Sequence, residues 1–228
     1  MSLTLPALLR LLHLVSPTLP VGAYSYSQGL ERAVEEGWVS DRATACQWIA
    51  DVLRMSVSSF EAPLVLRLYD AWSTSDRTAL AGWNDYFLAG RETAELRAET
   101  AQMGYSLRAL IHRLPQTTGE LAATLDTLDP LAFPTAFAGL AQAAAIGRSE
   151  ALAGYLWAWL ENQVLAAVKI VPLGQVAGQT ILLKLADQLP ACVEAALIAE
   201  ENDIVNFCPA LAIASARHEA QFARMFRS

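Results

Sequence analysis

The side chains that most often act as nucleophiles or metal ligands are few in this sequence and lie far apart. The chain has three histidines and three cysteines, which are His13, His112, His218, Cys46, Cys192 and Cys208. Zinc sites usually draw on short spacings such as CxxC or HExxH, and neither pattern occurs. The GxSxG nucleophile turn and the GxxxxGK(S/T) phosphate loop are also missing. The sequence therefore predicts no catalytic residue, no metal site and no bound cofactor, and we do not expect an enzyme.

The overall composition excludes several further classes of protein. The formal net charge is −7, whereas a nucleic-acid-binding domain normally carries a basic face. The cysteines are odd in number and widely separated, which is typical of a reducing compartment. The apolar start, Leu3 to Val15, is interrupted by Arg10 and His13, and no stretch reaches the roughly 18 uncharged apolar residues of a spanning helix. We therefore expect a cytoplasmic protein that binds neither nucleic acid nor membrane.

Apolar residues recur at helical spacing along most of the chain. After Asp41 they fall at positions 45, 48, 49, 52 and 53, and Ser149 is expected to cap a long helix that ends before Pro172. Further helices are expected at residues 5–15, 26–36, 62–73, 76–90, 91–114, 119–128, 134–146, 173–189 and 190–201. The segments between them, at residues 16–22, 114–119 and 129–135, are too short to be interdomain linkers. The sequence predicts an all-α fold, with residues 1–228 forming a single-domain bundle of about ten helices.

The segment Ser16–Glu31 (SPTLPVGAYSYSQGLE) combines two prolines with glycines ahead of a predicted helix. Ser25 and Gln28 have the spacing of a capping box for that helix. A rigid entry into a helix explains most of the segment, but Tyr24 and Tyr26 lie outside its apolar stripe. These two side chains are candidates for contact with a partner protein, and a purely structural role is the alternative.

Three acidic residues and one lysine are candidates for a charged contact surface. Arg91, Glu95 and Glu99 are four residues apart and share one face of a predicted helix. Glu31 ends the first motif, and Lys169 stands alone in an apolar stretch near the end of the long helix. An ordinary solvated face also explains the carboxylates, and a lysine stem that covers apolar surface also explains Lys169. We expect Glu31, Glu95 and Lys169 to face solvent.

The last twelve residues combine arginines with aromatic side chains in an otherwise acidic protein. Arg217, Arg224 and Arg227 are interspersed with Phe222 and Phe226. Arginine and aromatic residues are enriched at the energetically dominant positions of protein interfaces. A frayed terminus is the alternative, although frayed ends seldom retain such large apolar side chains. We expect this tail to be disordered or loosely packed in the free protein and to become ordered against a partner.

Four segments, in their order along the chain, resemble the UreF family of urease accessory proteins. They are residues 16–31, residues 91–99 (RETAELRAE), residues 167–183 (beginning AVKIVPLGQ) and residues 214–228 (ASARHEAQFARMFRS). The chain departs from the family pattern at Phe222, Ala223 and Met225, where tyrosine, serine and leucine are expected. The first two departures remove hydroxyl groups, together with any hydrogen bond that those hydroxyls make in relatives.

The resemblance implies an all-α homodimer that assists the maturation of urease. It implies binding to a UreD/UreH-type accessory protein, to a UreG-type GTPase and to the urease apoprotein. Hydrolysis of GTP by the GTPase is then coupled to nickel delivery, and nickel is handled by the complex without being stably bound to this chain. The alternatives are a helical metal-dependent enzyme and a regulatory partner of a GTPase outside the urease system.

The resemblance also assigns candidate residues to each partner. Glu31, Glu95, Glu99 and Lys169 form the expected GTPase-facing surface, and Tyr24 and Tyr26 form an N-terminal contact. The tail, residues 217–228, is expected to bind the UreD/UreH-type protein through Arg217, His218, Phe222, Arg224, Met225, Phe226 and Arg227.

Overall fold

The computed structural model describes residues 3–114 and 119–228, and its regular elements over those residues are all helical. Residues 115–118, which belong to one of the predicted connecting segments, lie outside the described residues. The α-helices are α1 (Leu5–Leu14), α2 (Leu30–Glu35), α3 (Arg42–Val52), α4 (Ala62–Ser73), α5 (Arg77–Ala89), α6 (Ala94–Ile111), α7 (Gly119–Leu125), α8 (Phe133–Ala143), α9 (Arg148–Ile170), α10 (Gln175–Ala186), α11 (Leu189–Ile198) and α12 (Pro209–His218). A π-helix, η2 (Leu53–Glu61), and two short 3-10 helices, η1 (Ala23–Ser25) and η3 (Glu201–Asp203), are also present. The all-α prediction is confirmed.

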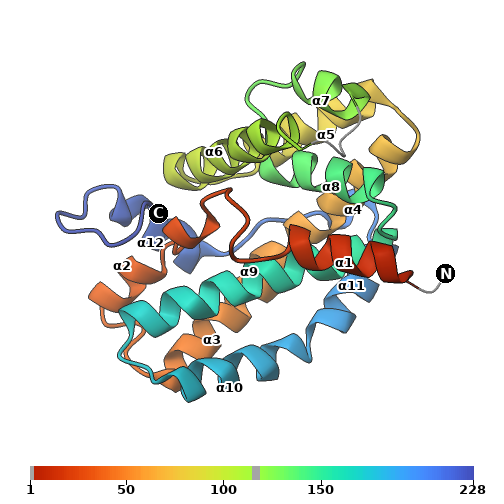
Figure 1. Ribbon diagram of the computed structural model, residues 1–228. Helices are drawn as coiled ribbons and strands as arrows, with labels where there is room; N and C mark the ends of the chain where they lie inside the picture. The colour runs from red at the N-terminus through yellow and green to blue at the C-terminus, as the bar shows by residue number, and fades with distance from the viewer. Residues whose placement is uncertain (1–2, 115–118) are drawn as a thin grey trace.

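The long helix α9 runs through the middle of the molecule, and the other helices surround it (Figure 1). Helices α5, α6, α7 and α8 lie on one side, at the top of the view, and α3 and α10 lie on the opposite side. The inner face of α9 carries Leu152, Leu156, Leu160 and Ala167, which have no exposed surface. Their helical spacing is the apolar stripe expected from the sequence, so this stripe builds the core.

Capping chemistry explains where several helices begin. At α3 the Asp41 carboxylate accepts the Thr44 N–H at 2.8 Å, and the Thr44 hydroxyl accepts the Asp41 N–H at 3.0 Å, which completes a capping box. The hydroxyl of Thr93 caps α6 by accepting the N–H of Leu96 at 3.2 Å. At α9 the prediction of Ser149 as the cap is wrong, because the helix already begins at Arg148.

Besides the two short 3-10 helices, two longer helical elements are not predicted by the periodicity of the sequence. The π-helix η2 joins α3 to α4, and its wider turn moves the apolar residues off the 3.6-residue spacing. The carbonyls of Met55 and Ser59 in η2 accept the backbone N–H groups of Phe207 at 3.3 Å and Val205 at 3.1 Å, so an extended segment docks along it. The second element, α12, begins at Pro209 and packs against α2 and α6.

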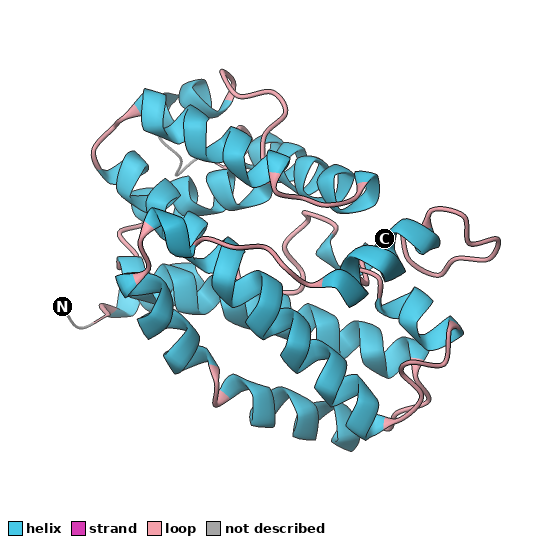
Figure 2. Cartoon of the chain, turned by 180° about the vertical axis from the view of Figure 1, so that it is seen from behind, coloured by secondary structure: helices cyan, strands magenta, loops and turns pink. Residues whose placement is uncertain are grey.

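The segment after α12 turns back toward α2 and α6, and a loop within it projects from the body of the molecule in both views (Figure 1, Figure 2). Because of this return, the end of the chain lies beside the N-terminal motif. Among the described helices, none combines the length and the apolar character needed to cross a membrane.

Candidate partner-binding site

The C-terminal tail is docked on the protein by backbone hydrogen bonds. The N–H of Arg227 donates to the carbonyl of Ser25 at 2.8 Å, and the N–H of Ser27 donates to the carbonyl of Ser228 at 2.8 Å. Ser228 is almost fully buried, and Phe226 is only 5% exposed. The expectation of a disordered or loosely packed tail is therefore wrong for the described structure. The tail pairs with the N-terminal motif, a partner that lies about 200 residues away and that the tail sequence itself does not reveal.

Glu31 lies at the centre of this docking. It stands in the first turn of α2 and is 9% exposed. One carboxylate oxygen accepts the N–H of Met225 at 2.7 Å, and the other accepts the N–H of Phe226 at 2.8 Å. The prediction that Glu31 faces solvent is wrong, because the returning tail covers it.

Glycine permits the close approach of α12 to α2 at this point. Gly29, the residue before α2, has φ +76°, a left-handed conformation that favours glycine. A Cβ atom at this position would lie 3.2 Å from the Cβ of Ala214 and 3.2 Å from the backbone nitrogen of Ser215. The predicted capping box of Ser25 and Gln28 is wrong, because α2 starts at Leu30 and its cap residue makes no side-chain hydrogen bond.

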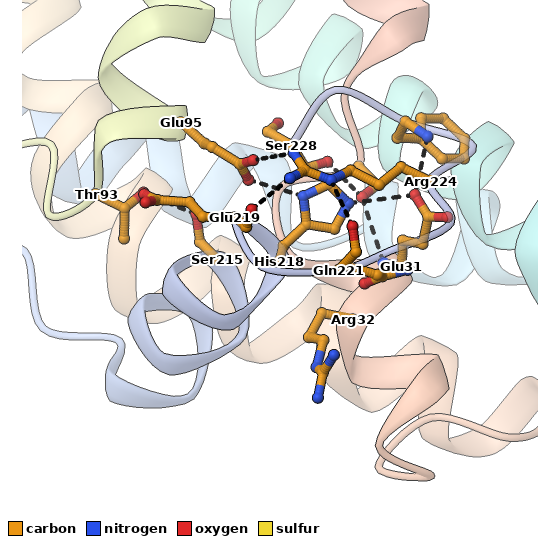
Figure 3. A network of polar contacts seen from close by, with 12 residues as sticks. Glu31, Arg32, Thr93, Glu95, Ser215, His218, Glu219, Gln221, Arg224 and Ser228 are labelled. Atoms are coloured by element: carbon orange, nitrogen blue, oxygen red, sulfur yellow. Dashed lines mark hydrogen bonds and ion pairs between the residues drawn. The ribbon is translucent and has the colours of Figure 1, made fainter.

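The fully buried ring of His218 lies between the carboxylates of Glu31 and Glu95 (Figure 3). Its Nδ1 is 2.8 Å from Glu95, and its Nε2 is 3.4 Å from Glu31. Glu95 also accepts a hydrogen bond of 2.8 Å from the guanidinium of Arg224, so it is mostly enclosed and does not project into solvent as predicted. Over residues 3–114 and 119–228, no group of three or more His, Cys, Asp and Glu side chains is arranged to hold a metal ion. His218 therefore links α12 to α2 and α6 and cannot offer a partner its ring directly.

Glu99 lies deeper, on the same helix as Glu95, and is 6% exposed. Its carboxylate accepts the Nε2–H of Gln28 at 2.7 Å and the hydroxyl of Ser228 at 2.9 Å. Burial raises the pKa of the Glu99 carboxyl from 4.5 to about 7, although the positive charge of Arg91 opposes this rise. Glu99 is thus a tail anchor inside the protein and not part of an exposed GTPase-facing surface.

A buried ion pair adjoins this network. Arg91 precedes α6 and does not share its face with Glu95 and Glu99 as predicted. Its guanidinium donates to Glu61 at 2.6 Å, and the hydroxyl of Tyr155 donates to the other oxygen of Glu61 at 2.6 Å. A cavity of about 100 Å³ runs between these groups and Glu99, enclosed mainly by apolar side chains.

Sequence reasoning did not find several members of this buried network, which are Gln28 as a core residue, Glu61, Tyr155 and Trp159. The Gln28 carbonyl oxygen accepts the indole N–H of Trp159 at 2.8 Å. The sequence carried one signal, which is the polar Gln28 two residues from each of the large side chains Tyr26 and Leu30. Nothing in the sequence indicates which distant residue would satisfy it.

Most of the remaining candidates are exposed, and Tyr24, Lys169 and Met225 border one hollow. Tyr24 is 62% exposed, Met225 is 66% exposed, and Phe222 on the projecting loop is fully exposed. Lys169 is also exposed, as predicted, and its Nζ lies 5.7 Å from the centroid of the Phe226 ring. Tyr26 is 5% exposed, so its predicted partner contact is wrong, and burial, followed by the charge of Glu99, raises the pKa of its hydroxyl.

A hollow of about 290 Å³ is lined by Tyr24, Ser25, Lys169, Met225, Phe226 and Arg227. We call the surface that these six residues form the composite patch. The patch joins three segments that are distant in the sequence. It carries cationic and aromatic groups on a protein of net charge −7. Such a surface suits a partner that presents acidic and apolar side chains.

Comparisons with known proteins agree with the resemblance. The UreF family model matches residues 39–186 of the chain. The urease accessory protein UreF of Methylobacillus flagellatus is 52% identical, over 97% of this chain and 98% of its own length. The proteins of the same name from Azoarcus sp. and Dechloromonas aromatica are 56% and 50% identical, each over 97% of this chain and over 95% and 97% of their own lengths. The chain therefore belongs to the UreF family of urease accessory proteins and is not a catalytic enzyme.

Proposed function

We propose that this chain is a nickel-insertion chaperone of urease maturation that holds a UreD/UreH-type accessory protein and a UreG-type GTPase in one complex. In that complex the chain couples GTP hydrolysis by the GTPase to nickel delivery into the urease apoprotein. The observation that carries the proposal is the composite patch, where the N-terminal motif, the end of α9 and the tail meet. A scaffold needs such a surface, whereas a metal-dependent enzyme would need a ligand cluster that the described residues do not assemble.

The two partners are assigned to this patch and to the tail segment that leads into it. The UreD/UreH-type protein binds the projecting loop and tail through Phe222, Arg224 and Met225, with Arg217 at the edge. The GTPase contacts Lys169 and Tyr24. Buried residues of the predicted site, such as His218 and Glu99, support the patch from below and do not touch a partner.

We further propose that the protein is a cytoplasmic homodimer. Helix α1 supports self-association, because Leu5, Leu9 and Leu12 on its outer side are more than half exposed. Leucines at this spacing form a stripe of the kind that pairs with another helix. Sedimentation at tens of micromolar (roughly, to include weak dimers) tests the dimer, and a pure monomer would contradict it for the free protein.

The test of the main proposal is reconstitution from separately purified components. The chain, a UreD/UreH-type protein and a UreG-type GTPase are mixed and separated by size, with and without the tail residues 219–228 on the chain. We expect the full chain to form a ternary complex that activates apo-urease with nickel and GTP, and the shortened chain to lose the UreD/UreH-type protein. The chain alone is expected neither to hydrolyse GTP nor to retain stoichiometric nickel. Absence of any complex with the full chain would contradict the proposal.

A further inference from the structure

We propose that Glu31 is a positioning residue, which shapes the composite patch by pinning the tail and does not itself touch a partner. The inference rests on the proposed function only in its last step, where the patch is said to bind other proteins.

The carboxylate of Glu31 binds two consecutive backbone N–H groups. Its two oxygens each accept one of them, from Met225 at 2.7 Å and from Phe226 at 2.8 Å. Hydrogen bonds to an ionised acceptor are about twice as strong as neutral ones, and here they form in a nearly water-free site. Two bonds to adjacent residues fix the position of the tail along α2 as well as its distance from it.

That fixed position decides which side chain faces outward. Met225 is 66% exposed, whereas Phe226 is 5% exposed and lies beneath Lys169. Both residues lie in a bend, and the hydrogen bonds to their two N–H groups hold Met225 outward and Phe226 inward. The hollow lined by Tyr24, Lys169 and Phe226 belongs to this arrangement of the tail.

Glu31 also closes the base of the projecting loop. The loop begins after His218, whose Nε2 lies 3.4 Å from Glu31, and it ends at Met225, whose N–H donates to the same carboxylate. Both ends of the loop are therefore held at one side chain, and Phe222 between them is fully exposed. Figure 1 shows the loop projecting from the body of the molecule. The bond between Glu95 and Arg224 supports the same loop from α6.

The alternative is that Glu31 meets the GTPase directly, as the family resemblance had implied. Its exposed fraction of 9% and its two backbone donors leave little of the carboxylate for a second protein. The two roles differ in what a substitution does to the free chain. Loss of a direct contact changes nothing in the absence of the partner, whereas loss of a positioning contact releases the tail.

The first measurement is amide hydrogen exchange on the free chain with Glu31→Gln. Glutamine keeps the shape of the side chain but turns an amide NH₂ toward N–H groups that need an acceptor. We expect protection at the Met225 and Phe226 amides to fall by about tenfold or more, while amides in α9 keep theirs. Glu35→Gln is the matched control, since Glu35 lies on the same helix, is exposed and pairs only with Arg32 among the contacts described for it. Unchanged protection at Met225 and Phe226 would overturn the proposal.

Should Glu31→Gln loosen the whole molecule, Glu31→Asp replaces it. Aspartate keeps the negative charge but withdraws the carboxylate by one methylene group, so it cannot reach both donors. We expect the same selective loss of protection in the tail. Retention of full protection with the aspartate variant would equally overturn the proposal.

The second measurement is a double-mutant cycle on affinity for the purified UreD/UreH-type protein. If Glu31 acts by presenting the loop, Glu31→Gln weakens binding much less in a chain that already carries Phe222→Ala than in the unmodified chain. Additive effects of the two substitutions would show that Glu31 acts independently of the loop and would overturn the proposal. Failure of the unmodified chain to bind would contradict the proposed function, and the exchange measurement on the free chain would still decide the role of Glu31.

Discussion

The amine of Lys169 lies 5.7 Å from the centre of the Phe226 ring, so the end of α9 and the C-terminal tail share one surface. The family resemblance had assigned these residues to different partners. Because the two residues are in contact, a protein bound to the tail changes the surroundings of Lys169. A protein bound at Lys169 changes the surroundings of the tail in the same way. A scaffold that must sense whether both partners are present could use this adjacency.

The first prediction separates the two lysines of the chain. Lys169→Ala removes one of the two cations of the composite patch. We expect affinity for the GTPase to fall about threefold to tenfold, with a weaker dependence on salt, because charges at an interface rim act mainly on association. Lys184→Ala is the control, since Lys184 is exposed on α10 and outside the patch. Equal losses of affinity for both variants would show that the net charge of the chain, and not the patch, determines binding.

The second prediction separates folding from binding in the tail. Phe226→Ala should lower the free energy of unfolding by roughly 2–4 kcal/mol, because it removes a buried ring. Phe222→Ala should leave stability within about 0.5 kcal/mol, because that ring is fully exposed, yet weaken binding of the UreD/UreH-type protein. Urea unfolding and a binding titration measure the two quantities. Equal stability of both variants would argue that the tail does not dock in solution.

The third prediction concerns pH. Burial raises the pKa of Glu99 from 4.5 in the unfolded chain to about 7, so the folded state holds the proton more tightly. This carboxyl therefore leaves stability unaffected below about pH 4.5, and it lowers stability as pH rises to about 7, by an amount on the order of 3 kcal/mol. Glu99→Gln removes the titration while keeping the shape that faces Gln28 and Ser228, with Arg91 and Glu61 nearby.

The measurement is the difference in unfolding free energy between Glu99→Gln and the unmodified chain, taken from pH 5 to pH 8. We expect an advantage of the variant of about 1 kcal/mol at pH 5 that grows to about 3 kcal/mol toward pH 8. A difference that does not change over this range would contradict the assignment of the proton to Glu99.

The fourth prediction tests the buried ion pair. Arg91→Met leaves Glu61 buried without its cation, and we expect a loss of about 3–5 kcal/mol of stability. Arg54→Met breaks the pair with Asp51 on the surface, where Arg54 is 74% exposed, and should cost less than about 1 kcal/mol. Thermal unfolding of the two variants under one condition provides the comparison. Similar midpoints would mean that Arg91 contributes no more than a surface charge.

The fifth prediction uses two glycines of equal backbone conformation. Gly29 and Gly37 both have φ +76°, but only at Gly29 would a Cβ meet neighbouring atoms, on α12. Gly37→Ala should therefore cost about 1–2 kcal/mol of backbone strain. Gly29→Ala should cost more and should also raise hydrogen exchange in α12 and the tail. If Gly29→Ala costs no more stability than Gly37→Ala, and α12 stays protected from exchange, then α12 can shift to make room for the Cβ atom without consequence.

The sequence by itself determined the helical architecture of this protein, because that information is local. Each predicted helix depends on the spacing of apolar residues within about a dozen positions, as in the stripe from Leu152 to Leu160 that became the core face of α9. The same local rule failed at η2, whose π-turns break the expected period, and at the short helix α12. The sequence also singled out the N-terminal motif, Lys169 and the tail.

Only the tertiary structure decided which of those candidates can meet a partner. Tyr26, Glu31, Glu99 and His218 read as polar groups available at the surface, yet all four are buried by segments distant in the chain. The N–H of Phe226 and the carboxylate that accepts it are 195 residues apart, and no pattern in either segment encodes the pairing. A buried charge is stable only where distant donors converge on it, and that convergence is a property of the folded chain, not of any window of its sequence.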